Sequence, residues 1–219
     1  MPEDTKRSTL SREKVLTAAV DLADEIGIEA LTIRKLADRL GVGAMTIYHH
    51  VPSKEAIIDG MVELVFAEIE KPPTDVDWKS AIRRRCISAR EVLNRHPWAA
   101  PLMESRLSPG PANLSHHDAV VGTLRNGGLS IQMTAHAYAI LDSFIYGFAF
   151  EEAVLPAGGG EGFAEIAEQI AAHFPADQYP HLAELTFEHV LKPGYSFGDS
   201  FEFGLDLIIE GLERAAQEE

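Results

Sequence analysis

The residues best suited to bind an anion lie at the start of a predicted helix. Thr32 can place a hydroxyl and free backbone amides at that helix end, where the helix dipole also favours a phosphate oxygen. Arg34 and Lys35 follow within the first turn, and each either contacts a phosphate or remains a solvated surface charge. Such contacts position a protein on a nucleic-acid backbone, but they do not read its sequence.

The elements around these residues have the spacing of a helix-turn-helix. Apolar periodicity predicts one helix that ends at Gly27 and a second over residues 33–40. A Gly-Val-Gly turn over residues 41–43 precedes a short third helix over residues 44–50. In this arrangement the helix after the turn enters the major groove of DNA.

The stretch from Leu31 to Met61, LTIRKLADRLGVGAMTIYHHVPSKEAIIDGM, resembles the DNA-binding head of tetracycline-repressor-like (TetR) regulators. The resemblance rests on the glycine turn, the Thr-x-Tyr recognition helix and the lysine that follows, and it covers about residues 10–70. The later residues resemble the ligand-binding domains of this family more loosely, chiefly in His96-Pro97-Trp98 and Gly147-Phe148. Membership would imply a homodimeric transcriptional regulator, most often a repressor, that binds a palindromic operator in double-stranded DNA and is released by a small molecule.

The resemblance also implies roles for single residues of this head. By the match of motifs, the backbone contacts fall to Thr46, Tyr48, His50 and Lys54, and the base edges face Ala44, Met45 and His49. Ala44 and Met45 have no side-chain hydrogen-bond donor, so they discriminate bases only by apolar contact, for which the thymine methyl group is the matching partner. We therefore expect thymines opposite these two side chains. The arm that contains Lys6 and Arg7 is expected to reach along a neighbouring groove.

Other patterns suggest different chemistry. Residues 194–198, Gly-Tyr-Ser-Phe-Gly, match the nucleophile elbow of serine hydrolases, but that elbow needs a preceding strand and the preceding segment is predicted to be helical. The adjacent His49 and His50 would point about 100° apart on a helix, which disfavours a shared metal ion. The sequence therefore predicts no catalytic residue, metal or cofactor. A serine hydrolase that uses Ser196, and a ligand-binding protein whose head no longer binds DNA, stay open as alternatives.

Helix-length apolar blocks predict that the whole chain is all-α, with an N-terminal three-helix head and a larger C-terminal helical bundle. A fourth helix is expected over about residues 53–70. Further helices are expected over about residues 79–94, 97–107, 112–126, 130–155, 162–173, 179–191 and 199–216. The proline-rich joint near Pro72 divides the chain into a DNA-binding domain with its joining helix, residues 1–71, and a ligand-binding and dimerisation domain, residues 72–219.

Two helices of the C-terminal bundle have the composition of a subunit interface. The helix from Ser130 is apolar on nearly all sides, so it needs cover from its own core and from a second subunit. The last helix contains two glycines, each of which costs about 1 kcal/mol relative to alanine and suggests close backbone approach. Packing within a monomeric core is the alternative. The residues expected in the interface are Leu141, Ile145, Phe148, Gly204, Ile208 and Gly211.

A small-molecule site is expected between the helices of the same bundle. Asp142 lies within an apolar helix, where burial is unfavourable unless the carboxylate is paired with a protein group or meets a ligand. The acidity of this part of the chain would weakly suit a cation. The other residues expected to line the cavity, each of which also fits an ordinary core, are Met103, Leu107, His136, Tyr138 and Phe144.

Composition and charge limit these interpretations. The chain has 219 residues with a formal net charge of -15, which repels nucleic acid over most of the surface. Its first 60 residues hold eight Lys and Arg against ten Asp and Glu, so a few well-placed cations in the head can still bind phosphates. The single cysteine, Cys86, and the absence of an apolar leader favour the reducing cytoplasm. The most apolar stretch, residues 134–150, is shorter than the roughly 20 residues of a membrane span.

Overall fold

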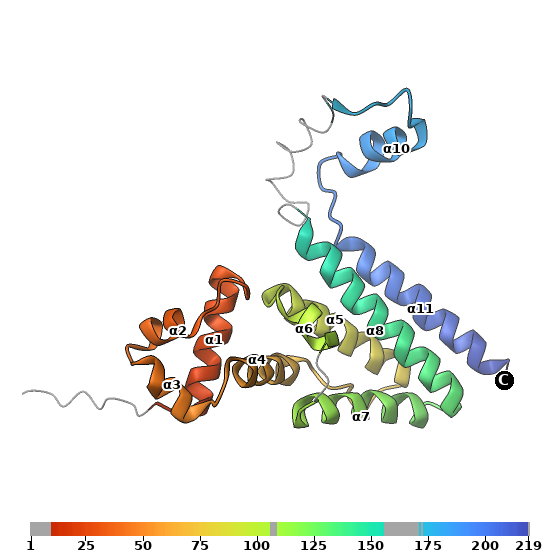
Figure 1. Ribbon diagram of the computed structural model, residues 1–219. Helices are drawn as coiled ribbons and strands as arrows, with labels where there is room; N and C mark the ends of the chain where they lie inside the picture. Colours follow the sequence, from red (N-terminus) through yellow and green to blue (C-terminus); the bar gives the residue numbers. More distant parts are fainter. Residues whose placement is uncertain (1–9, 106–108, 156–170, 172, 219) are drawn as a thin grey trace, which may run out of the picture. The chain divides into compact units, whose positions relative to one another are not determined.

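The computed structural model describes residues 10–105, 109–155, 171 and 173–218, and all the regular structure within these ranges is helical. The predicted all-α fold is therefore confirmed. The chain divides into two compact units, residues 1–128 and 129–219 (Figure 1). None of the described helices is long and apolar enough to cross a membrane. Leu107, the arm with Lys6 and Arg7, and most of the helix predicted over residues 162–173 lie outside the described residues.

The head consists of α1 (Arg12–Ile26), α2 (Ile33–Leu40) and α3 (Ala44–His50). Side-chain hydroxyl groups cap the N-termini of the first two helices. The Ser11 hydroxyl accepts a hydrogen bond from the backbone N–H of Lys14, and the Thr32 hydroxyl accepts one from the N–H of Lys35, both at 3.2 Å. Gly41 ends α2 with a φ of 65°, a left-handed conformation that glycine adopts without strain. Helices α2 and α3 pack on α1 (Figure 1). Local sequence signals thus fix the helix-turn-helix.

The joining helix α4 (Lys54–Glu68) begins at Ser53, whose hydroxyl accepts the backbone N–H of Ala56 at 3.0 Å. Gly60 lies against α1 so closely that a Cβ there would be 2.6 Å from a methyl carbon of Leu16. Helix α4 packs on α1 and also on α6 and α7. It therefore connects the head with the rest of the first unit.

Three more helices complete this unit, α5 (Trp78–Arg95), α6 (Ala99–Ser105) and α7 (Pro111–Asn126). The carboxylate of Asp77 caps α5 by accepting the backbone N–H groups of Lys79 and Ser80 at 3.0 and 3.2 Å. Helix α7 packs against both α4 and α5. The side of α5 that is buried holds Ala81, Ile82, Arg85, Cys86 and Ala89.

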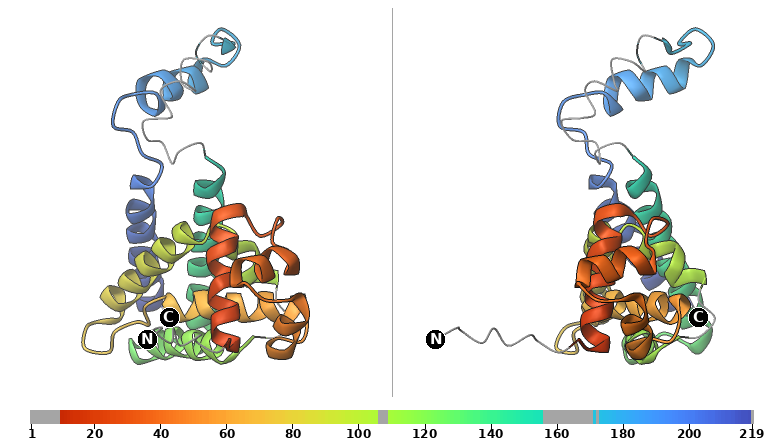
Figure 2. Two further views of the ribbon diagram at one scale, coloured as in Figure 1. Left: turned by 90° about the vertical axis from the view of Figure 1, so that its left-hand side faces the viewer. Right: turned by 60° about the vertical axis from the view of Figure 1, so that its left-hand side comes forward.

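The second unit contains α8 (Ile131–Val154), α10 (Pro180–Leu185), the π-helical η2 (Thr186–Val190) and α11 (Asp199–Gln217). Helices α8 and α11 lie side by side and pack on each other (Figures 1 and 2). Phenylalanine rings fill this contact, with Phe144 stacked on Phe201 at 5.2 Å and Phe148 on Phe197 at 4.6 Å between ring centres. Gly204 lies close to a side chain of α8, since a Cβ there would be 2.9 Å from Phe144 Cζ, whereas a Cβ at Gly211 would have no neighbour within 4 Å.

Within the described residues, the predicted helix boundaries agree with the structure to within a few residues, because caps, glycines and prolines are local signals. The exception is the single helix predicted over residues 179–191. There α10 continues as η2, and the N–H of Leu191 donates to the carbonyl of Thr186, five residues back, at 2.9 Å. Apolar spacing of three and four residues does not reveal such a widened turn.

Candidate functional site

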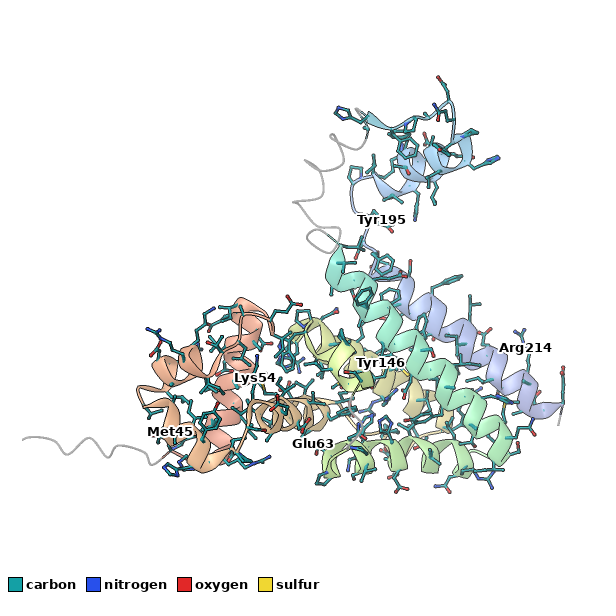
Figure 3. The ribbon with its side chains drawn as sticks, in the orientation of Figure 1. Met45, Lys54, Glu63, Tyr146, Tyr195 and Arg214 are labelled. Atoms are coloured by element: carbon teal, nitrogen blue, oxygen red, sulfur yellow. The ribbon has the colours of Figure 1, made fainter. Side chains whose placement is uncertain are left out.

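Helix α3 presents the side chains that the sequence assigned to DNA. Ile47 is buried and fixes the helix to the head, while Met45 is 70% exposed and Tyr48 is 39% exposed. Ala44 and His49 are also exposed. Figure 3 labels Met45 on the head, and no side chain caps the N-terminus of α3 at Gly43. The exposed face can therefore contact a macromolecule.

The candidate phosphate contacts lie on α3 itself and at the starts of α2 and α4. Thr46, His50 and Lys54 are half-buried, and Arg34 is exposed. The Thr32 oxygen accepts the cap hydrogen bond, which leaves its own hydrogen free to point to an anion. The ammonium of Lys35 donates to the carbonyl of Ala30 at 3.1 Å, so one of its three hydrogens is used within the head.

Another cation of the head pairs with a carboxylate of the same unit. Arg39 makes two hydrogen bonds to the carboxylate of Glu25, at 2.6 and 2.8 Å, and this pair joins α2 to α1. The hydrogen bond lowers the pKa of Glu25 and raises that of Arg39. The two residues are 14 positions apart and lie on different helices, so the periodicity of a single helix could not predict this pair.

A buried histidine connects α1 with α4 and with the end of α5. His96 Nδ1 lies 2.9 Å from Asp24 Oδ1 on α1, and its Nε2 lies 3.3 Å from Glu68 Oε2 on α4. The indole N–H of Trp98 donates to Asp24 Oδ1 at 2.6 Å, and Arg95 donates to Glu68 at 2.7 Å. Burial raises the pKa of Glu68, but the hydrogen bonds from Arg95 and His96 outweigh it, and the pKa is lowered. This network was not predicted, although the sequence singled out residues 96–98.

A second connection joins α4 to α7. The Glu63 carboxylate, labelled in Figure 3, accepts the backbone N–H groups of Ala112 and Asn113 at 2.8 and 3.2 Å. It caps the positive end of α7, which has no cap from its own sequence. A pocket of about 220 Å³ adjoins this contact, and Met103, expected to bind ligand, is one of its lining residues.

The other residues expected at the ligand site lie on α8. Tyr138, Asp142 and Phe144 are half-buried, and His136 is exposed. The ring of Phe144 stacks on Phe201 and therefore packs against α11. It contributes to the contact between these two helices, a role that the sequence left open as core packing.

The first unit buries a polar pair that was not predicted. Arg85 on α5 is 1% exposed, and its Nε–H donates to Nε2 of His116 on α7 at 2.9 Å. Burial, followed by the positive charges of Arg85, His117 and Lys71, lowers the pKa of His116 to about 3. The described residues contain no group of three or more His, Cys, Asp or Glu side chains placed to hold a metal ion.

Two residues expected in the subunit interface belong to the core instead. Leu141 and Ile145 are each 1% exposed in the single chain, so a partner surface cannot reach them. Because α8 is apolar on nearly all sides, its sequence did not show which side faces the core. The large apolar side chains that α8 and α11 expose are Ile131, Ile140, Phe150, Val154, Phe203 and Leu207.

The nucleophile elbow suggested around Ser196 is also absent. The helical segments α10 and η2 precede it, and the described part of the chain contains no strand from which such an elbow could project. Gly194 turns the chain with a φ of 87° shortly before α11 begins. The glycine-bounded motif is therefore a turn before the last helix.

Two family models match the chain, "Bacterial regulatory proteins, tetR family" over residues 15–61 and "Tetracyclin repressor-like, C-terminal domain" over residues 71–216. An HTH-type transcriptional regulator of Saccharopolyspora erythraea is 32% identical over 80% of this chain and 77% of its own length. The HTH-type transcriptional repressor DrrR1 of Streptomyces coeruleorubidus is 29% identical over 97% of this chain and 80% of its own. Among solved structures, ActR of Streptomyces coelicolor in complex with actinorhodin matches with a TM-score of 0.76 at 27% identity, covering 95% and 99% of the two chains. Since the second family model spans well over half of the sequence, the chain belongs to the TetR family of bacterial transcriptional regulators.

Proposed function

We propose that the protein is a homodimeric repressor that acts in the cytoplasm, binds a palindromic operator and is released by a small molecule. The observation that carries this proposal is the exposed face of α3, on which Met45 and Tyr48 stand outward from a helix anchored by Ile47. A helix presented in this way fits the major groove. In two copies held one helical turn apart, the faces would read half-sites about 34 Å apart.

Within this proposal, residues of the head divide into two groups. Base edges face Ala44, Met45 and His49. The phosphate contacts are Thr32, Arg34, Lys35, Thr46, Tyr48, His50 and Lys54. The net charge of -15 should keep non-specific affinity weak, and because few cations neutralise phosphates, raising the salt should weaken binding with only a modest slope.

The second copy would dock on the faces of α8 and α11. These helices leave large apolar side chains exposed, including Ile140 on α8 and both Phe203 and Leu207 on α11. Gly147 and Gly211 have open space around them, so the backbones of a partner could approach there. A four-helix interface would cover these side chains.

The division of labour would follow the joint near residue 72, with residues 1–71 for DNA and residues 72–219 for ligand and partner. Ligand binding would displace α4, which holds α7 through Glu63. The contact of Asp24 with His96 would carry the same displacement to α1. A ligand that prefers the displaced heads lowers operator affinity, and the operator lowers ligand affinity by the same factor.

The test is selection of bound duplexes from a random pool at about 50 mM salt. We expect the selected duplexes to contain a palindrome whose two half-sites have centres about one helical turn apart. A screen for metabolites that release the protein from this operator then identifies the ligand. Lys54→Ala should weaken binding to all sequences alike, whereas Met45→Ala should change the preferred bases. Lys192→Ala, whose ion pair with Glu188 is exposed, is the control. Failure to enrich any sequence would contradict the proposal.

A further inference from the structure

One buried imidazole nitrogen in the first unit has no hydrogen-bond partner within the part of the chain that the structure describes. His116 is 1% exposed, and its Nδ1 is one of two such side-chain atoms among the described residues. The other is the hydroxyl oxygen of Thr134 in the second unit. Buried polar atoms are nearly always hydrogen-bonded, so an exception needs an explanation. His116 is the more informative case because its neighbour determines which nitrogen carries the hydrogen.

That neighbour is Arg85, which can only donate. Its Nε–H donates to His116 Nε2, so Nε2 is the acceptor and a neutral ring must carry its hydrogen on Nδ1. Burial and the nearby cations lower the pKa of His116 to about 3, which keeps the ring neutral at physiological pH. Nδ1–H is therefore a buried donor that finds no acceptor among the described residues.

Three basic side chains and one aromatic ring lie near this donor. Arg85, His117 and Lys71 each act to lower the pKa of His116, and Lys71 comes near enough to donate to Ser115 on the same helix at 2.6 Å. The ring of Phe66 on α4 lies 6.2 Å from the His116 ring and 5.6 Å from the His117 ring. An acceptor that carries negative charge on an aromatic body suits this environment.

We propose that His116 recognises the small-molecule ligand of this regulator through Nδ1–H, and that the ligand is an aromatic acid that presents a carboxylate or phenolate oxygen. Arg85 positions the ring by holding Nε2. The proposal rests on the proposed function, because it names the chemistry of the molecule that would release the operator. It is opposite to the weak preference for cations expected from the net charge of the chain.

Two substitutions separate the two nitrogens of the ring. In His116→Gln the amide reaches about as far as Nε2, so it can still accept from Arg85, but the Nδ1–H donor is lost. In His116→Asn the amide lies near the position of Nδ1, so a donor is kept there. The probes are sodium benzoate and benzylamine, which have similar rings and opposite charges at pH 7. Direct titration calorimetry and the shift in Tm measure their binding to the dimer without DNA, with sodium chloride matching the ionic strength.

We expect benzoate to bind the wild-type protein and raise its Tm, and benzylamine to do neither. His116→Gln should weaken benzoate binding by at least about tenfold, and His116→Asn should weaken it less. Without probe, His116→Gln should keep or raise the Tm, because a donor without an acceptor is removed. Benzoate binding that His116→Gln leaves unchanged, no binding to the wild type, or a Tm of the variant several degrees lower would each overturn the proposal. Operator selection by the wild-type protein is a separate measurement. Absence of benzoate binding would contradict this inference, whereas failure to enrich an operator would contradict the proposed function.

Discussion

The contact between Asp24 and the pair His96 and Trp98 should control how the body influences the DNA-binding head. Asp24→Asn removes the charge from a carboxylate that accepts Trp98 Nε1–H at 2.6 Å and faces His96 Nδ1 at 2.9 Å. The adjacent Glu25→Gln is the matched control, because Glu25 pairs with Arg39 inside the head and does not contact the body.

The expected magnitude follows from burial. His96 and Trp98 are each 7% exposed, so their donors cannot turn to water when the carboxylate changes. Hydrogen bonds to a charged group contribute about 1.5–3 kcal/mol each, and asparagine keeps one oxygen for Trp98, so we expect the free energy of unfolding to fall by about 2 kcal/mol. Glu25→Gln should change it much less, since exposed ion pairs contribute little.

Two assays measure the consequence. Urea unfolding gives the free energy of unfolding of each variant. Titration of a fluorescent operator, with and without the small molecule that releases it, gives the ligand-dependent change in operator Kd. Asp24→Asn should reduce the ligand-dependent change in operator Kd at least about threefold. In the wild type this contact, which contributes about 2 kcal/mol, holds α1 to the body and opposes independent movement of the head, so its loss should uncouple the head from the ligand. Glu25→Gln should leave that change intact. Equal effects of the two variants on the ligand response would refute the reasoning, whatever their effects on stability.

Three further perturbations test other parts of the structure. Replacing thymine by uracil in the selected operator removes only the methyl group that Met45 is expected to contact, so the affinity should fall by a measurable factor in a competition assay, and Met45→Ala should abolish the difference. Gly60→Ala should lower the free energy of unfolding in urea by about 1–3 kcal/mol, because its Cβ would overlap leucine methyl groups of α1. The pKa of His116 falls from 6.5 to about 3 on folding, so below pH 6.5 the unfolded chain holds a proton that the folded chain lacks. Stability should therefore decrease on acidification by about 1.4 kcal/mol per pH unit from this group, and His116→Gln should remove that part of the slope between pH 6.5 and 5.

The helices and the head could be predicted because their signals are local. The Thr32 hydroxyl caps α2 by accepting the N–H of Lys35, only three residues later, and Gly41 directly follows the end of the same helix. The exposed face of α3 follows from the same short-range pattern, once Ile47 is assigned to the core. Long-range pairs are different, since Asp24 and His96 are separated by 72 positions and no periodicity relates them. Only the fold brings them together, so sequence spacing could not reveal the contact.

The faces of α8 were ambiguous for a related reason. A helix with a single apolar stripe reveals its buried side, but α8 has apolar residues around its whole circumference. Leu141 and Ile140 are adjacent, and yet one is 1% exposed and the other 47%. The difference depends on what packs against α8, so the interface predicted for Leu141 and Ile145 was wrong although the helix itself was predicted correctly.

Arg85 shows that a local signal for the buried polar pair did exist. Three consecutive arginines, 83 to 85, look alike in composition, but successive residues of a helix point 100° apart. Arg84 is exposed and pairs with Glu70 at 2.6 Å, whereas Arg85 falls on the stripe of Ile82, Cys86 and Ala89 that the core covers. A guanidinium on an apolar stripe cannot be a solvated surface charge, and burying it requires acceptors nearby. The helical period therefore indicates that one of these three arginines has a partner in the interior. The structure identifies His116 as one such partner of Arg85.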